Sequence, residues 1–317
     1  MPNWNDILRE IQEYQEAHAE EPQEAIRAID VIRRKYLKKL YDHRHRNIIA
    51  YYSGFLSKPT LSNQDINDED KNGFMMAIHR LDRKEGLDLI LHTPGGNIAA
   101  AQSIVNYLHK MFGNDIEAII PQIAMSAGSM IACSCNKIHM AKHSNIGPID
   151  PQLRDVPAYG VVREFRRACR EIKNDPSKIA LWAVIIEQYR PTFLGQCENA
   201  IRWSNAFVRE QLETVMFEGQ PDAKEKAKNI VRKLASYNRN RTHEQHIHFE
   251  ECDAIGLNVE AIEKDPIFQD LLLTVHHCYM HSLMNTPSYK IIENHLGTAL
   301  VKQSQALLLQ QPIQAIQ

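Results

Sequence analysis

The sequence lacks the features that would attach a protein to a membrane or export it. No apolar run in its 317 residues approaches the length of about 18 residues that a membrane-spanning helix needs. The first residues contain no basic segment followed by an apolar one, so they do not form a signal-peptide pattern. We therefore expect a cytoplasmic protein without a membrane anchor.

Cysteine and net charge are also scarce. Six cysteines in a chain of this length do not form the disulfide framework of a small secreted domain. Cys133 and Cys135 lie close to His139 and His143, but the two cysteines would face different sides of a helix, and a zinc site needs convergent ligands. We expect core cysteines, no metal and no other cofactor. The net charge of −2 gives no overall attraction to nucleic acid or to an anionic membrane.

Two short apolar runs, at residues 87–91 and 116–120, have the length and branched side chains of buried parallel strands. Residues 98–112 between them carry apolar side chains at helical spacing. Such a strand–helix–strand unit has a right-handed connection, and its strands end at the same edge of the sheet. The small-residue turns that follow the strands are Thr93-Pro94-Gly95-Gly96 and Met125-Ser126-Ala127-Gly128.

The second turn offers a nucleophile and the first offers backbone donors. Ser126 precedes a predicted helix over residues 127–135, so its hydroxyl should be exposed and the N–H groups behind it should lack helical partners. Consecutive glycines let Gly95 and Gly96 present N–H groups without a side chain in the way. A carbonyl carbon beside Ser126 Oγ would place its developing negative charge between the Gly96 and Ala127 N–H groups, as in an oxyanion hole.

These motifs resemble those of the Clp-fold serine peptidases, which include the Clp proteolytic subunit and signal peptide peptidase A. The resemblance is closest to the serine dehydrogenase proteinase family and covers nearly the whole chain. Agreement over several separated blocks is specific, whereas Pro-Gly-Gly alone would be weak. The blocks are residues 33–37, 49–54, 70–74, 92–96, 124–129 and 143–152.

The resemblance implies an α/β chain with the Clp/crotonase-like fold and a mostly parallel sheet. We expect an N-terminal helical extension at residues 1–46, the serine peptidase domain at 47–265, and a C-terminal helical segment and tail at 266–317. The resemblance further implies a serine endopeptidase that cleaves peptides or unfolded proteins through an acyl-enzyme. Clp-fold chains usually assemble into rings, so we expect a homo-oligomer.

The resemblance also indicates how Ser126 is assisted. A serine needs a base to become a nucleophile at neutral pH. Signal peptide peptidases use a lysine well after the serine, which suggests Lys178 and a Ser–Lys dyad here. His143 is the alternative base, although the histidine of the Clp proteolytic subunit would fall nearer Ile149. His92 is a third candidate, with a more indirect role expected.

Four residues are predicted to contribute to the substrate-binding site. Gly95 belongs to the diglycine turn, and Ser129 lies on the same side of the helix as Ser126. Ile146 and Gly147 belong to a loop shaped by glycine and proline, and similar loops in Clp-fold proteins help to line the peptide groove.

From residue 159 the pattern becomes helical, with breaks at residues 175–177 and 219–222 where proline and glycine occur. A helix ending at Gly256 and a strand should follow. The remaining predicted helices cover residues 4–19, 22–41, 70–81, 161–172, 178–187, 197–218, 223–237 and 270–284.

Two other classes of function stay open. An acyl-CoA hydratase or thioesterase on the same fold would use the two N–H groups to polarise a thioester carbonyl. A non-catalytic oligomeric scaffold would hold nucleic acid on the basic residues between 33 and 46, but no glycine-rich phosphate loop accompanies them. We expect this basic face to pair with the acidic helix at residues 4–19, and we do not expect nucleic acid as a partner.

Overall fold

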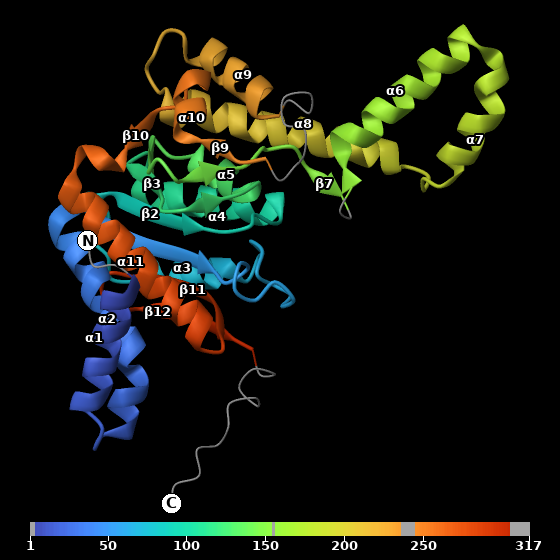
Figure 1. Ribbon diagram of the computed structural model, residues 1–317. Helices are drawn as coiled ribbons and strands as arrows, with labels where there is room; N and C mark the ends of the chain where they lie inside the picture. The colour runs from blue at the N-terminus through green and yellow to red at the C-terminus, as the bar shows by residue number, and fades with distance from the viewer. Residues whose placement is uncertain (1–3, 154–155, 236–244, 305–317) are drawn as a thin grey trace, which may run out of the picture.

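The computed structural model describes residues 4–153, 156–235 and 245–304. Its centre is a seven-stranded sheet in the order β10-β5-β3-β2-β1-β11-β12 (Figure 1). The first five of these strands are parallel, and β11 and β12 are antiparallel at one edge. The predicted α/β class with a mostly parallel sheet is therefore confirmed. The strands are β1 (Asn47–Ser53), β2 (Leu87–His92), β3 (Ile116–Ile120), β5 (Lys137–Met140), β10 (Val259–Ala261), β11 (Ser288–Asn294) and β12 (Ala299–Gln303).

The predicted strand–helix–strand unit is present. β1 and β2 are buried along their whole length, which agrees with their mostly apolar sequences. Between β2 and β3 runs α4 (Ile98–Phe112), as predicted. The Asn97 side chain caps α4 by accepting hydrogen bonds from the N–H groups of Ala99 and Ala100.

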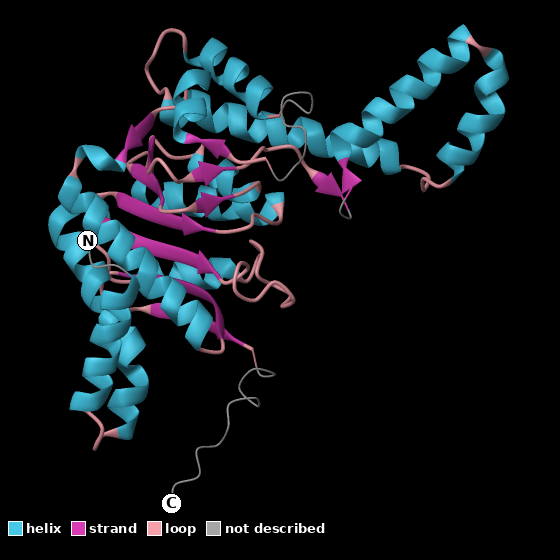
Figure 2. Cartoon of the chain, viewed as in Figure 1, coloured by secondary structure: helices cyan, strands magenta, loops and turns pink. Residues whose placement is uncertain are grey.

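Helices cover both faces of the sheet (Figure 2). On one face, α3 (Asp70–Ile78), α4 and α5 (Ala127–Ala132) pack into the larger apolar core. On the other face, α2 (Pro22–Arg44) and α11 (Pro266–Asn285) form a second core with β1 and β11. Within the described ranges, no helix combines the length and the apolar character needed to cross a bilayer.

The two predicted N-terminal helices are present and pack together as a hairpin. α1 (Trp4–Ala17) packs against α2 through Ile7, Ile11 and Ile32, and the buried Cys278 of α11 completes this cluster. The hairpin is therefore attached to the sheet by apolar contacts with the helix that covers it.

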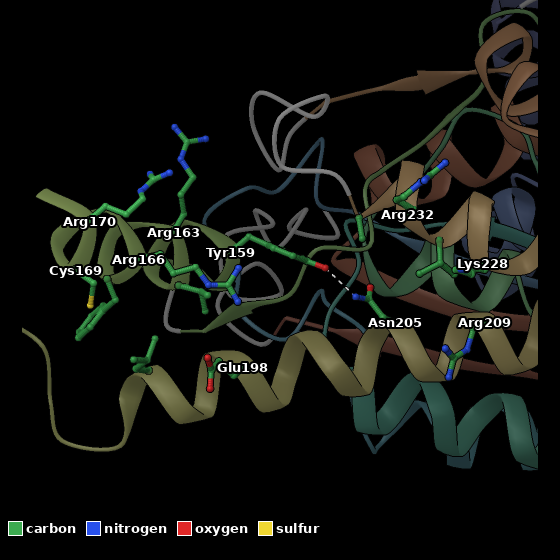
Figure 3. Close-up of a pocket in the computed structure, with 15 residues that line it drawn as sticks. Tyr159, Arg163, Arg166, Cys169, Arg170, Glu198, Asn205, Arg209, Lys228 and Arg232 are labelled. Carbon is green, nitrogen blue, oxygen red and sulfur yellow. Dashed lines mark hydrogen bonds between the residues drawn. The ribbon is translucent and has the colours of Figure 1, made fainter. Parts of the chain in front are cut away.

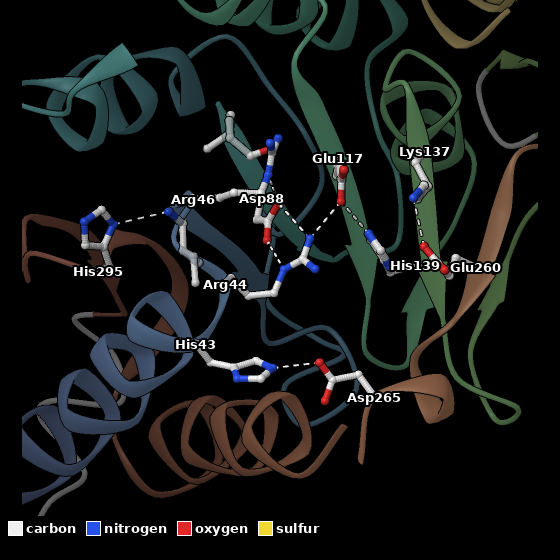
Figure 4. A network of polar contacts seen from close by, with 12 residues as sticks. His43, Arg44, Arg46, Asp88, Glu117, Lys137, His139, Glu260, Asp265 and His295 are labelled. Carbon is white, nitrogen blue, oxygen red and sulfur yellow. Dashed lines mark hydrogen bonds and ion pairs between the residues drawn. The ribbon is translucent and has the colours of Figure 1, made fainter. Parts of the chain in front are cut away.

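The basic residues between 33 and 46 are largely neutralised within the chain. Arg44 and Arg46 each bind the buried carboxylate of Asp88 at 2.7 Å, and Arg44 also reaches Glu117 at 2.8 Å (Figure 4). Among the described residues, the expected pairing with the first helix occurs only at Lys35, which binds Glu10. This surface offers little unpaired positive charge to nucleic acid. The paired residues are Arg33, Arg34, Lys35, Lys38, Arg44 and Arg46.

The C-terminal segment departs from the expectation of helices and a tail. α11 confirms the last predicted helix, but β11 and β12 extend the central sheet next to β1. Lys290 and Glu293 interrupt the apolar pattern of β11, yet both are fully buried. Lys290 Nζ lies 2.9 Å from an Asp70 carboxylate oxygen, and Arg33 Nε lies 2.7 Å from Glu293. Their partners lie on helices distant in the sequence. The charged residues therefore made this segment look unlike a buried strand, and the sequence pattern did not predict it. The predicted tail after residue 304 lies outside the described residues.

The predicted helices beyond residue 158 form an arm and a cap. α6 (Ala158–Asn174) and α7 (Ile179–Glu187) extend away from the sheet as an arm (Figure 1). The base of α6 packs on α8 (Phe193–Gln211) through Val161, Val162 and Cys197. α8 runs into a short π-helix, Leu212–Met216, and α9 (Ala223–Leu234) follows. Next come α10 (Phe249–Ile255) and β10, joined at Gly256 in the left-handed conformation, as predicted.

Candidate active site

The two small-residue turns lie side by side at the carboxyl edge of the sheet. After β3 a short strand, β4 (Ile123–Ala124), carries the chain alongside the end of β2. The Thr93 N–H donates to the Ile123 carbonyl at 3.1 Å, and the Met125 N–H donates to the Thr93 carbonyl at 3.0 Å. These two bonds fix the serine turn next to the diglycine turn, the arrangement expected from two adjacent parallel strands.

Ser126 lies in a strained turn between β4 and α5. Its φ of +50° and ψ of −114° are unusual for a residue with a side chain. The residue is partly exposed, and its hydroxyl does not cap the helix that follows. The hydroxyl is therefore accessible and is not used to stabilise α5, as a nucleophile requires.

The diglycine turn touches the serine turn directly. Gly95 has a φ of +100°, and a Cβ added to it would lie 2.7 Å from both Met125 O and Ser126 Cβ and 3.2 Å from Ala127 N. The Gly95 N–H donates to Thr93 Oγ1 at 3.2 Å. Within the described part of the chain, the N–H groups of Gly96 and Ala127 have no acceptor. Each of the two turns that meet at Ser126 thus contains one N–H group without an acceptor in the described residues.

A residue that the sequence analysis missed holds Gly96 in place. The Ile66 N–H donates to the Gly95 carbonyl at 2.7 Å, and the Ile66 carbonyl accepts from the Asn97 N–H at 2.9 Å. A Cβ on Gly96 would lie only 2.3 Å from Ile66 N, so only glycine fits there. The available signal was weak: Ile66 is a lone large apolar residue in the polar segment between Leu61 and Phe74.

The other predicted substrate-binding residues divide into two groups. Gly147 borders the site, because a Cβ on it would lie 3.1 Å from Ser126 N. Ser129 and Ile146 are fully buried. Ser129 Oγ donates to the Ala124 carbonyl at 2.9 Å and accepts from the Gly147 N–H at 2.9 Å. The side chains of Ser129 and Ile146 therefore support the turn from inside and are closed to a substrate.

Comparison with known proteins agrees with this geometry. A family model described as ClpP-like SDH-type serine proteinase matches residues 19–290. The chain belongs to this family. Two relatives come from Methanocaldococcus jannaschii: the uncharacterized protein MJ0137 is 27% identical over 252 residues, which are 78% of this chain and 80% of the relative. The uncharacterized protein MJ1495 is 30% identical over 196 residues, or 62% of this chain and 59% of the relative.

In this ClpP-like proteinase the predicted base Lys178 does not meet Ser126 of its own chain. Lys178 ends a short 3-10 helix, Pro176–Lys178, at the tip of the arm where α6 gives way to α7 (Figure 1). Its side chain is 41% exposed, and its Nζ lies 3.4 Å from a Glu171 carboxylate oxygen. Within one chain, Lys178 and Ser126 are therefore on different parts of the molecule.

His143 is also separated from Ser126. β4 runs parallel to β6 (Asn145–Ile146), with Ile123 opposite Asn145. In agreement with this register, His143 Nε2 hydrogen-bonds to the Pro121 carbonyl at 3.0 Å. Pro121 precedes β4, whereas Ser126 follows it. The alternative base thus lies at the opposite end of the short strand.

His92 is buried on the opposite side of β2 from the apolar face that α4 and α5 cover. It packs against the rings of Tyr52, Phe55 and His276, with ring centroids 5.2–5.4 Å apart. Burial lowers the pKa of His92 to about 3. An imidazole with such a pKa is a weak base near neutral pH, so His92 acts as a packing residue.

The cysteines and histidines considered for zinc have other roles. Cys133 and Cys135 are core residues, as predicted, and burial raises the pKa of the Cys133 thiol to about 12. His139 Nε2 hydrogen-bonds to Glu117 at 2.6 Å. In the described segments no group of three or more His, Cys, Asp or Glu residues is arranged to bind a metal.

Proposed function

We propose that this chain is a serine endopeptidase that hydrolyses peptide bonds in peptides or unfolded proteins through an acyl-enzyme on Ser126. A general base takes the proton of Ser126 Oγ as it attacks the peptide carbonyl, and the Gly96 and Ala127 N–H groups stabilise the oxyanion. The base returns the proton to the departing amine, and water then hydrolyses the acyl ester and restores the Ser126 hydroxyl. The observation that carries this proposal is the direct contact of the diglycine turn with Ser126 and Ala127. A cytoplasmic location belongs to the same proposal.

The general base of this proposal is Lys178 from a second copy of the chain. Lys178 is followed by α7, whose apolar residues Ile179, Leu181 and Val184 are 54%, 59% and 63% exposed. An apolar helix on a projecting arm favours contact with another subunit. Such contact would bury Lys178, and burial is the condition under which a lysine loses its proton near neutral pH. The expected homo-oligomeric ring therefore becomes part of the catalytic proposal.

Active-site labelling tests the nucleophile. We expect a fluorophosphonate to label the wild-type protein at Ser126, located by mass spectrometry, and Ser126→Ala to lose the label and peptidase activity by a factor on the order of 10⁴ or more. An acyl-CoA hydratase on this fold would not be labelled at Ser126. Labelling at another serine, or activity that survives Ser126→Ala, would disprove the assignment.

Subunit mixing tests the base. We expect Ser126→Ala and Lys178→Ala each to be inactive as separate proteins. When the two are co-expressed, random assembly should restore about a quarter of wild-type activity, because some sites then combine an intact serine with an intact lysine from another copy. If the mixed assemblies remain as inactive as the single variants, the base does not come from a second subunit.

A further inference from the structure

A groove lies between the base of the arm and the helices that cap the sheet. It is formed by α6, α8 and α9 and has a volume of about 1320 Å³ (Figure 3). Arg166 of α6 extends into the space between α6 and α8, and Arg209 and Lys228 continue the lining toward α9 (Figure 3). The groove is therefore built from three helices of one stretch of the chain, residues 158–234.

The lining of the groove is strongly basic. Its cationic residues are Arg163, Arg166, Arg170, Arg209, Lys228 and Arg232, whereas Glu198 is its one carboxylate. Arg166, Arg170 and Arg209 are exposed, and in the described ranges none of the three forms an ion pair. The whole chain carries a net charge of −2, so this concentration of positive charge is local. A concave surface lined by one sign of charge attracts ligands of the opposite sign.

Half of the uncharged lining residues are aliphatic, and two are aromatic. Val162, Leu194, Val231 and Ala235 line the groove together with the ring of Phe165. Tyr159, the other aromatic residue, uses its hydroxyl to accept a hydrogen bond from Asn205 at 2.8 Å. A groove for single-stranded nucleic acid would present several aromatic faces for base stacking. Aliphatic residues between arginines suit a polypeptide with alternating apolar and acidic side chains.

The groove is connected to the serine site by one short segment. Gly147 borders Ser126, and two residues later the Ile149 carbonyl accepts a hydrogen bond from Ser204 Oγ on α8 at 2.7 Å. The Ile149 N–H donates to the Leu234 carbonyl of α9 at 3.4 Å. Ser204 and Leu234 are each adjacent in sequence to a residue that lines the groove. A polypeptide held in the groove would thus lie on the same side of the molecule as the loop beside Ser126.

We propose that this groove binds acidic segments of polypeptide substrates and so selects what reaches Ser126. The inference rests on the proposed peptidase function for the identity of its ligand. Carboxylate side chains would pair with Arg166 and Arg209, while the apolar side chains between them contact Phe165 and Leu194.

Binding is measured with the Ser126→Ala protein, which separates it from cleavage. The probes are a fluorescein-labelled peptide rich in Glu and Leu, the same peptide with Gln in place of every Glu, and single-stranded oligothymidylate. We expect the acidic peptide to bind about tenfold or more tightly than its Gln counterpart, with an affinity that falls as salt is added. The labelling of Ser126 in the wild-type protein is a separate readout, so either proposal can fail while the other stands.

Charge-neutralising variants locate the site. Adding Arg166→Gln together with Arg209→Gln should weaken binding of the acidic peptide by about tenfold. Arg167→Gln is the matched control: Arg167 also lies on α6, but it pairs with Glu171 at 2.7 Å and does not line the groove. Equal binding of the two peptides, an equal loss in the control, or tighter binding of oligothymidylate than of the acidic peptide would each overturn the proposal.

Discussion

Individual glycines set how closely the two turns of the site approach. Gly95 and Gly96 both have positive φ, and each lies against backbone atoms of another segment. The serine turn and the loop around Ile66 can contact the diglycine turn only because no side chain intervenes. The spacing between Ser126 and the two N–H donors proposed for the oxyanion therefore depends on these two positions.

Gly95→Ala should abolish activity. The new methyl group would lie 2.7 Å from Met125 O and Ser126 Cβ, so one of the turns must move and the oxyanion donors shift with it. We expect fluorophosphonate labelling of Ser126 to slow by about 10²-fold or more. Gly113→Ala is the control, because Gly113 also has positive φ (+63°) but a Cβ there meets nothing within 4 Å. If both variants label alike, the close approach at Gly95 is unimportant.

At the scale of elements, buried ion pairs join the sheet to its covering helices. Arg44 at the end of α2 and Arg46 beyond it bind Asp88 of β2, and Arg44 also reaches Glu117 of β3 (Figure 4). Burial alone would raise the pKa of Glu117, but the His139 hydrogen bond and the charges of His139 and the two arginines lower it to about 2. These contacts fix the amino edge of the sheet, opposite the serine turn.

The Glu117 contacts should make stability depend on acid pH. A carboxyl group whose pKa is lowered on folding stabilises the protein above its unfolded pKa of about 4.3 and loses that contribution as the pH falls toward 2. We expect Glu117→Gln to lower the unfolding free energy by ~2 kcal/mol at pH 7 and to flatten its decline in acid, measured by urea unfolding.

Glu225→Gln is the matched control for Glu117→Gln. Glu225 is exposed and lies 3.8 Å from Lys228, so its removal should change stability by less than about 0.5 kcal/mol. If the unfolding free energy of Glu117→Gln falls in acid as steeply as that of the wild type, Glu117 contributes little to the pH dependence of stability.

At the scale of the whole molecule, the arm carries apolar side chains on α7 that no other part of the described chain buries. Trp182 is the one buried residue of α7 and anchors it by donating from Nε1 to Glu171 at 3.2 Å. α7, which carries exposed apolar side chains, lies away from the sheet at the end of the arm (Figure 1). Assembly through this helix would explain both its composition and its position.

Leu181→Glu should disrupt the proposed assembly. Leu181 is 59% exposed, so a charge there should leave the fold of the subunit intact while opposing burial of α7 against another copy. We expect a smaller particle by light scattering, and loss of activity along with it. Ile26→Glu, at an exposed position on α2 (81%), is the control and should leave the particle size unchanged. An unchanged particle size in Leu181→Glu would exclude α7 as the contact.

Local patterns were sufficient for the parallel part of the sheet and for the serine turn. The apolar runs at 87–91 and 116–120 needed no distant partner to be recognised, and small residues after each strand indicated where the site would be. Local patterns did not predict β11, because its charged residues Lys290 and Glu293 interrupt the apolar run. Residues more than two hundred positions away neutralise both charges.

What the sequence determined by itself was the set of local conformations, because apolar periodicity, glycine and proline act on neighbouring residues. Only the tertiary structure decided which chemical groups meet. It placed Ile66 against Gly96, and it separated both Lys178 and His143 from Ser126. It also gathered arginines from three helices into one groove. These relationships depend on how elements distant in the chain pack together, and no short-range pattern of residues encodes that packing.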